Sequence, residues 1–294
     1  MPAYNHERFV AASINSVLEQ TCSDLELVII DDGSTDNTAK IIGGYDDPRL
    51  RYHFQDNQDA FNALNEGLEK AEGQFIAIIN SDDVYHPRRL ERCLQEHESS
   101  GARFIFSDVT PINDNGEELI NHPWQQWHQG NRDYYFEESD LYRGFLHGNF
   151  MVTTSNVFMT RELQQQVGGF TNLRYLHDYD FVFRLLLAAE AQTCYLADER
   201  LLSYRIHDGN TLGEAAITGR EQDQRVIRSY LLQSLPEASH KRVETAIDRL
   251  IALEHELLDV KRQLRNQSAP ATPPSPAPLP MGQRVKQRLL RALK

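Results

Sequence analysis

Continuous apolar runs alternate with amphipathic stretches through the first two hundred residues of the chain. Apolar runs are typical of strands buried on both faces, and apolar residues at a period near 3.6 are typical of helices. The pattern predicts helices over residues 9–20, 62–71, 88–100, 161–167 and 179–189. It predicts strands over residues 25–30, 49–54, 75–79, 103–109, 150–159 and 201–206. Parallel strands joined by crossover helices produce such an alternation, so the predicted fold class is α/β.

One stretch, residues 113–140, breaks this pattern, because its periodicity is weak and it is rich in polar and aromatic residues. It is predicted to be an extended loop region. The aromatic residues over 123–136 can stack on a flat apolar face of a ligand or cover the core as a hydrophobic flap, and the pattern does not separate the two.

From Arg220 onward the pattern is helical only. A 3-4 spacing of apolar residues forms a seam of about three heptads, with members Val243, Ala246, Leu250, Leu253, Leu257, Val260 and Leu264. This seam predicts either a coiled coil between copies of the chain, so that residues 243–264 form a homo-oligomer, or a helix that packs on the α/β domain of its own chain.

Two short segments end the chain. Six prolines over residues 268–280 predict an extended linker. In the tail that follows, apolar residues recur every fourth position among basic ones, which suits an amphipathic helix at an anionic membrane surface or a frayed terminus. The predicted organisation is an α/β domain over 1–212, a helical extension over 213–267, a linker over 268–281 and a basic tail over 282–294.

Composition narrows the class of protein. With 294 residues, 40% hydrophobic and 25% charged, the chain can bury a substantial core. Its formal net charge of −13 argues against general nucleic-acid binding. Three widely spaced cysteines, no apolar run long enough to span a membrane and no signal peptide favour a cytoplasmic protein.

Two acidic clusters, residues 31–36 and 80–83, follow predicted strands directly. Open α/β sheets bind their ligands at the carboxyl ends of the strands. Adjacent carboxylates repel each other unless a cation or a hydrogen-bond donor lies between them, so both clusters are candidates for a ligand site. Taken singly, each can also be a turn that caps the next helix.

Further short motifs follow in a fixed order. The first half of the chain holds Pro2-Ala3-Tyr4-Asn5, Asp31-Asp32-Gly33-Ser34-Thr35-Asp36 and Asn80-Ser81-Asp82-Asp83. The second half holds Gly168-Gly169-Phe170, His177-Asp178-Tyr179-Asp180 and Tyr204-Arg205-Ile206-His207. Over residues 1 to about 212 this order closely resembles glycosyltransferase family 2. The resemblance implies the GT-A fold, a mixed sheet flanked by helices.

The resemblance also implies site residues. Those expected to bind the nucleotide sugar are Pro2, Ala3, Tyr4, Asn5, Asp32, Asn80, Ser81 and Arg205. Asp82 and His207 are expected to hold Mg²⁺ or Mn²⁺. Asn80 replaces the first acidic residue of the family's Asp-x-Asp site, which leaves Asp82 as the acidic ligand. A surface role for Arg205 and a structural role for His207 remain open alternatives.

Asp178 stands where the family places its general base, after a residue that is usually Glu and here is His177. A base there takes the proton of the attacking hydroxyl, and attack opposite the leaving group inverts the anomeric centre. The alternative for Asp178 is a helix N-cap. For Asp180 we expect an ion pair with Arg184, four residues later on the helix.

The expected function is therefore metal-assisted, inverting transfer of a sugar from a nucleoside-diphosphate sugar to a hydroxyl group. A UDP-sugar is the first candidate donor, and a saccharide or lipid-linked molecule is the acceptor, in the cytoplasm or at the inner membrane face. One alternative is a non-catalytic sugar-nucleotide-binding or scaffold protein of the same fold. Another is a sugar nucleotidyltransferase, although the Gly-rich basic loop expected there is missing from the N-terminal region.

The family's first strand usually runs several residues before the motif at residues 2–5, whereas here Met1 adjoins Pro2. Most of a central strand would then be missing, which exposes backbone hydrogen-bonding groups. We therefore expect the natural protein to start upstream.

Overall fold

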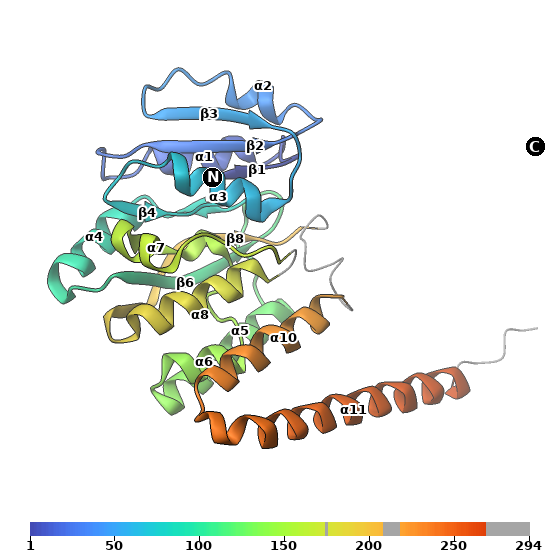
Figure 1. Ribbon diagram of the computed structural model, residues 1–294. Helices are drawn as coiled ribbons and strands as arrows, with labels where there is room; N and C mark the ends of the chain where they lie inside the picture. Colours follow the sequence, from blue (N-terminus) through green and yellow to red (C-terminus); the bar gives the residue numbers. More distant parts are fainter. Residues whose placement is uncertain (174–175, 208–217, 269–294) are drawn as a thin grey trace, which may run out of the picture. The chain divides into compact units, whose positions relative to one another are not determined.

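The computed structural model describes residues 1–173, 176–207 and 218–268 (Figure 1). The chain divides into two compact units, Met1–Ser234 and Leu235–Lys294. Most of the described part of the second unit is α11, a helix of 32 residues (Glu237–Ser268). The predicted linker and basic tail lie outside the described residues, apart from the first linker residue, Ser268, which ends α11.

The first unit begins with a sheet of three parallel strands in the order β1-β2-β3. Their bounds are Pro2–Ala3, Leu27–Asp32 and Leu50–Gln55. Every residue of β2 is buried, as its continuous apolar run predicts. Because β2 pairs with β3 through Asp32 and Gln55, the first acidic cluster starts at the carboxyl edge of the sheet.

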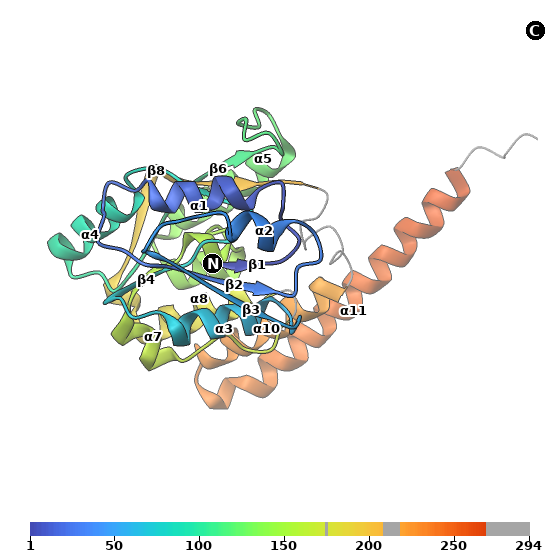
Figure 2. The ribbon, with the colours of Figure 1, turned by 90° about the horizontal axis from the view of Figure 1, so that it is seen from above.

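Helices cover both faces of these strands. Their bounds are Val10–Leu18 for α1, Thr38–Ile42 for α2 and Ala60–Lys70 for α3. Seen from above, α1 and α2 lie on one side of the strands and α3 on the other (Figure 2). The first seventy residues thus form the predicted α/β arrangement.

The second sheet has five strands in the order β4-β7-β6-β8-β5. Their bounds are Phe75–Ala77 (β4), Phe158–Thr160 (β7), Phe104–Ile112 (β6), Thr193–Arg205 (β8) and Val84–Tyr85 (β5). Only β6 and β8 pair in parallel, and the other three pairs are antiparallel. The two sheets together confirm the mixed α/β fold flanked by helices, whereas the purely parallel arrangement suggested by the alternation holds for the first sheet alone.

The remaining helices of the first unit surround this second sheet. They are α4 (Arg89–Ser100), α5 (Pro123–Glu138), α6 (Leu141–His147), α7 (Arg161–Val167), α8 (His177–Ala189) and α10 (Thr218–Gln233). None of the helices in the described part of the chain is long and apolar enough to cross a membrane.

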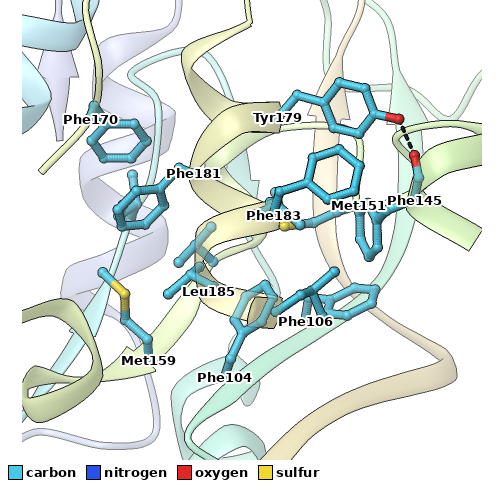
Figure 3. Close-up of a cluster of buried hydrophobic side chains, with 14 of the residues drawn as sticks. Phe104, Phe106, Phe145, Met151, Met159, Phe170, Tyr179, Phe181, Phe183 and Leu185 are labelled. Atoms are coloured by element: carbon cyan, nitrogen blue, oxygen red, sulfur yellow. Dashed lines mark hydrogen bonds between the residues drawn. The ribbon is translucent and has the colours of Figure 1, made fainter. Parts of the chain in front are cut away.

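An aromatic core fixes α8 against β6. Phe104 and Phe106 of β6 belong to the same buried cluster as Phe181 and Phe183 of α8 (Figure 3). The Tyr179 hydroxyl donates a hydrogen bond to the carbonyl of Phe145 at the amino-terminal end of α8 (Figure 3). These contacts hold the first turn of α8, which carries Asp178.

Two sequence predictions fail for identifiable reasons. Residues 113–140 contain the helix α5 rather than only a loop. Its start is specified by a capping box between His122 and Gln125 with a proline at the first turn, but the helix fully buries only His128 and Asn131, so no apolar period is visible. Residues 150–157 precede a short β7, because hydrogen-bonding side chains hold this segment in an irregular course that includes a 3-10 turn.

Candidate active site

Three side chains from distant segments meet near the carboxyl edge of the sheets. His6 follows β1, Asp82 lies in the turn after β4, and His207 follows β8. The Oδ2 atom of Asp82 lies 3.1 Å from Nε2 of His207, and one ligand atom of each residue lies within 4.8 Å of the others. The structure therefore brings together both predicted metal ligands, Asp82 and His207, and adds His6.

Neighbouring groups fix the orientation of these side chains. Nδ1 of His6 hydrogen-bonds to Oγ of Ser81 at 2.7 Å, and its backbone N–H donates to Thr38 at 2.9 Å. The ring of Phe9 packs against His207 with 4.8 Å between ring centroids. Such supporting contacts orient the imidazole rings, as they do around metal-binding histidines in general.

The electrostatics of the cluster suit a cation. Burial lowers the pKa of His6, which favours the neutral imidazole that a metal requires. Burial alone would raise the pKa of Asp82, but the hydrogen bond with His207 and the proximity of His6 lower it below its usual value. One ionised carboxylate and two imidazoles are a donor set suited to Mn²⁺ and other transition-metal ions, whereas Mg²⁺ prefers oxygen ligands.

Asp83, the neighbour of Asp82, has the opposite environment. It is fully buried, its Oδ1 accepts from the backbone N–H of Arg205 at 3.0 Å, and its Oδ2 accepts from Ser155 and Thr153. Burial and the charge of Asp82 raise the pKa of Asp83 to about 8. The hydrogen bonds of Asp83 thus connect the turn that carries Asp82 to β8 and to the segment before β7.

Asn80 and Arg205 make contacts within the protein. The side chain of Asn80 donates to Thr153 and accepts from Thr154, both at 3.0 Å. The guanidinium of Arg205 donates to the carbonyl groups of Asp82 at 2.8 Å and Asn113 at 2.7 Å. These bonds hold the turn that carries Asp82, and a contact of Asn80 or Arg205 with the nucleotide remains a prediction.

The first acidic cluster and the motif at residues 2–5 lie beside each other. The backbone N–H of Asn5 donates to Oγ of Ser34 at 3.0 Å, and Oδ1 of Asn5 accepts from Thr35 at 2.8 Å. Asp32 is buried, and its Oδ1 accepts from Gln55 at 2.7 Å and from the backbone N–H of Gln58 at 2.9 Å. Pro2 and Ala3 form β1, whereas Tyr4 is 47% exposed at this edge.

A glycine is required in this loop. Gly33 has φ +79°, and a Cβ atom there would approach the backbone nitrogen of Asn57 to 2.8 Å. A side chain at this position would therefore displace the loop that follows Asp32.

Asp178 lies in the first turn of α8, where Asn149 donates from Nδ2 to its Oδ2 at 3.2 Å. The other oxygen, Oδ1 of Asp178, and Oδ1 of Asn149 are buried and lack a hydrogen-bond partner within the described residues. Burial raises the pKa of Asp178, although His177 and Asn149 act in the opposite direction. The residue at the N-cap of α8 is Leu176, so Asp178 does not cap the helix.

Asp180 behaves as its sequence position predicts. Its Oδ2 forms the expected ion pair with Arg184 at 2.9 Å and accepts from Thr171 at 2.7 Å. Its Oδ1 accepts from the hydroxyl of Tyr230, on α10, at 2.7 Å. Asp180 thus anchors α8, while Asp178, two residues earlier, has an oxygen without a hydrogen-bond partner among the residues that the structure describes.

The segments that carry these residues form one connected edge. β2 and β8 end on the same side of the unit, where α8 begins (Figure 1). His6 bonds to the turn at Ser81, and Thr153 joins that turn to the segment that starts at Asn149. Among the described residues, Asp32, Asp82 and Asp178 are therefore linked through short hydrogen-bonded segments.

Sequence reasoning missed His6, Asp83 and Asn149. His6 directly follows the motif at residues 2–5, so its position offered a usable signal. Asn149 directly precedes the strand predicted over residues 150–159, and its bond to Asp178 spans 29 residues of sequence. Local spacing does not predict such a contact.

Comparison with known proteins gives matches to one family. The model of "Glycosyl transferase family 2" matches residues 1–166. An uncharacterized glycosyltransferase of Rickettsia typhi is 26% identical over 73% of this chain and 65% of its own length. WfgD of Escherichia coli, a UDP-Glc:alpha-D-GlcNAc-diphosphoundecaprenol beta-1,3-glucosyltransferase, is 35% identical over 39% of this chain and 46% of its own. The chain thus spans less than two thirds of the length of these curated relatives.

Solved structures share the fold. TarS of S. aureus in complex with UDP-GlcNAc has a TM-score of 0.61 at 19% identity, covering 81% of this chain and 67% of its own. The mannosyltransferase PcManGT from Pyrobaculum calidifontis, in complex with GDP-Man and Mn²⁺, has a TM-score of 0.59 at 15% identity, covering 100% of this chain and 79% of its own. These similarities confirm the predicted GT-A fold.

Proposed function

The chain belongs to glycosyl transferase family 2, and on that basis we propose that it transfers a sugar from a nucleoside-diphosphate sugar to a hydroxyl group. The observation that carries the proposal is the cluster of His6, Asp82 and His207 at the edge where β2 and β8 end. WfgD is named for UDP-Glc, and the TarS and PcManGT structures contain UDP-GlcNAc and GDP-Man. A UDP-sugar is the first donor to test, with a saccharide or lipid-linked acceptor.

The loops at residues 2–5 and 31–35 would bind the nucleoside. Oδ1 of Asp32 is engaged by Gln55 and Gln58, which leaves Oδ2 to accept from a base N–H or a ribose hydroxyl. The exposed ring of Tyr4 would stack on an aromatic base. Ser34 holds the two loops together, so a nucleoside site there would be formed before the ligand binds.

His6, Asp82 and His207 would hold a divalent cation, and their nitrogen-rich donor set favours Mn²⁺ over Mg²⁺. When bound, such an ion stabilises the negative charge that develops on the departing diphosphate. Arg205 contributes by holding the carbonyl of Asp82, which fixes the direction of the carboxylate.

Asp178 would accept the proton of the attacking hydroxyl through Oδ1, which has no hydrogen-bond partner in the described part of the chain. A pKa raised by burial makes this carboxylate a stronger base, and Asn149 holds the other oxygen in place. Attack from the side of Asp178, opposite the diphosphate, would invert the anomeric centre in a single step.

The test is turnover of the purified full chain with UDP-Glc, UDP-GlcNAc and GDP-Man, with Mn²⁺, with Mg²⁺ and with EDTA. We expect release of the nucleoside diphosphate that depends on the metal and is faster with Mn²⁺, and NMR of the transferred sugar gives its anomeric configuration. A thermal-shift assay distinguishes the scaffold alternative, because a non-catalytic protein would be stabilised by a nucleotide sugar without consuming it. If none of these donors is consumed or raises the melting temperature, the proposal is wrong for these donors.

The membrane contact through the basic tail stays a prediction, since that tail is outside the described residues. Vesicles that contain anionic lipid, compared with neutral vesicles, test it directly by co-sedimentation. Binding to both kinds of vesicle, or to neither, would contradict the electrostatic contact.

A further inference from the structure

The part of the heptad seam from Leu250 to Leu257 is an exposed apolar surface of α11. Leu250, Leu253 and Leu257 have exposed fractions of 65%, 42% and 53%. Ile247 and Ile251, which lie outside the seam, are half-buried. Single exposed leucines are common, but three at a 3-4 spacing on one helix form a continuous stripe, and such stripes bind a partner.

We propose that α11 pairs with α11 of a second copy of this chain as a parallel, in-register, two-stranded coiled coil. Leu250 and Leu257 then take a positions and Leu253 takes the d position between them. Each leucine inserts between residues of the facing helix, which removes the exposed stripe from water. This inference does not depend on the proposed catalytic activity.

The charges beside the seam favour the parallel orientation. Arg249 takes a g position and Glu254 the following e position, and in a parallel pair a g residue faces the next e residue of the partner helix. Arg249 of each chain therefore meets Glu254 of the other. In the sequence the arrangement recurs one heptad later, with Glu256 at g and Lys261 at e.

These two residues do not pair within one helix, because positions five apart point to different sides. In the single chain Arg249 instead pairs with Glu256 at 3.4 Å, and both side chains are highly exposed, at 64% and 65%. Such a surface pair is weak, so little is lost when Arg249 turns toward a second chain.

An antiparallel pairing of the same seam fits less well. Antiparallel helices pack a residues against d residues of the partner. With Leu250 facing Leu253 of the other chain, Arg249 lies near Glu256 of that chain, but Glu254 lies near the apolar Ile247 and gains no opposite charge. The parallel pairing gives each of these charged residues a partner of opposite charge. Because the seam has only about three heptads, we expect a reversible dimer that dissociates on dilution.

The first test is sedimentation of the full chain over a wide range of concentration. We expect a monomer–dimer equilibrium, and Leu253→Glu should raise the dissociation constant more than about tenfold. Ala252→Glu is the matched control, since this neighbouring position points away from the seam and should leave the equilibrium unchanged. A monomer at every concentration, a trimer or tetramer, or equal effects of the two substitutions would overturn the proposal.

The second test separates the two orientations. Arg249→Glu and Glu254→Arg should each weaken the dimer, and the double variant should restore it, because both inter-chain pairs are then reversed. Ala246→Cys, near one end of the seam, should form a disulfide between two copies under mild oxidation, with the wild type as the uncrosslinked control. Additive effects of the charge reversals, or no crosslink at position 246, would rule out the parallel register.

Discussion

Replacing Asp178 with asparagine should greatly slow catalysis without weakening the fold. The substitution keeps the shape of the side chain and an oxygen that accepts from Nδ2 of Asn149. It removes a charge that burial disfavours, on a side chain whose Oδ1 has no partner among the described residues. Catalysis and stability should therefore change in opposite directions.

The magnitudes follow from the two roles. A general base contributes about 10²–10⁴ in rate, so kcat should fall by that factor. For each unit by which the pKa of Asp178 in the folded state exceeds its pKa in the unfolded state, the protein loses about 1.4 kcal/mol of stability. This loss is complete at pH values above the folded-state pKa. Asp178→Asn removes this penalty, and for a chain of this size each kcal/mol gained raises Tm by about 2–4 °C.

The pH dependence gives the sign of the effect. At low pH the carboxyl is protonated in both folded and unfolded states, so its raised pKa has no effect on stability. As pH rises above the usual value of 3.8, the unfolded chain loses the proton first, and wild-type stability falls relative to Asp178→Asn. Above the raised folded-state pKa the gap stays constant. Chemical denaturation at a series of pH values measures it.

Asp180→Asn is the matched control, because it is two residues away on the same helix. It weakens the ion pair with Arg184 and a hydrogen bond from Tyr230, so we expect a loss of about 1–3 kcal/mol with much of the transfer activity kept. If Asp178→Asn turns over at the wild-type rate, Asp178 is not the base. If its Tm falls as far as that of Asp180→Asn, Asp178 has a structural role that this reasoning missed.

Four further outcomes are expected. His207→Ala should raise the Mn²⁺ concentration for half-maximal activity by at least about tenfold in a metal titration, and an unchanged titration would exclude it as a ligand. Asn149→Ala should lower kcat/KM about tenfold and also lower Tm, because it removes the donor to a buried carboxylate, whereas a fall in Tm alone would make Asn149 structural. The acid limb of the pH–rate profile should lie above pH 3.8 because the pKa of Asp178 is raised, and a limb at the usual value would contradict its burial. Tyr230→Phe should lose about 1 kcal/mol in urea unfolding, since it removes the bond to Asp180, and an unchanged midpoint would show that this bond contributes nothing.

The sequence predicts the parts of the fold that depend on local pattern. The apolar run of β2 and its acidic end are visible directly, because each residue of that strand is buried and the chain turns at the sheet edge. The helix α5 is not visible, because most of its side chains are polar or aromatic and few are buried. The strand predicted over residues 150–159 is wrong for residues 150–157 for a related reason. Ser, Thr and Asn side chains in this segment compete with strand hydrogen bonds.

The sequence predicts only those site residues that belong to the motifs of the resemblance. Asp82 and His207 follow from the resemblance, and the structure brings them together across 125 residues of sequence. The bonds of Asn80 to Thr153 and Thr154 span more than 70 residues, so spacing gives no sign that its amide is engaged within the protein. Contacts of this kind depend on tertiary packing rather than on any local signal.

The adjacent carboxylates Asp82 and Asp83 illustrate how packing changes a conclusion drawn from sequence. As neighbours they would repel each other if both were ionised and unpartnered. Their surroundings differ instead. The hydrogen bond with His207 and the nearby His6 lower the pKa of Asp82 against its burial. Burial and the charge of Asp82 raise the pKa of Asp83 to about 8, although its hydroxyl partners act in the opposite direction. At neutral pH the turn therefore presents mainly one negative charge. With uncharged imidazoles as the other ligands, a divalent cation held there keeps a net positive charge toward a diphosphate, which two ionised aspartates would have cancelled.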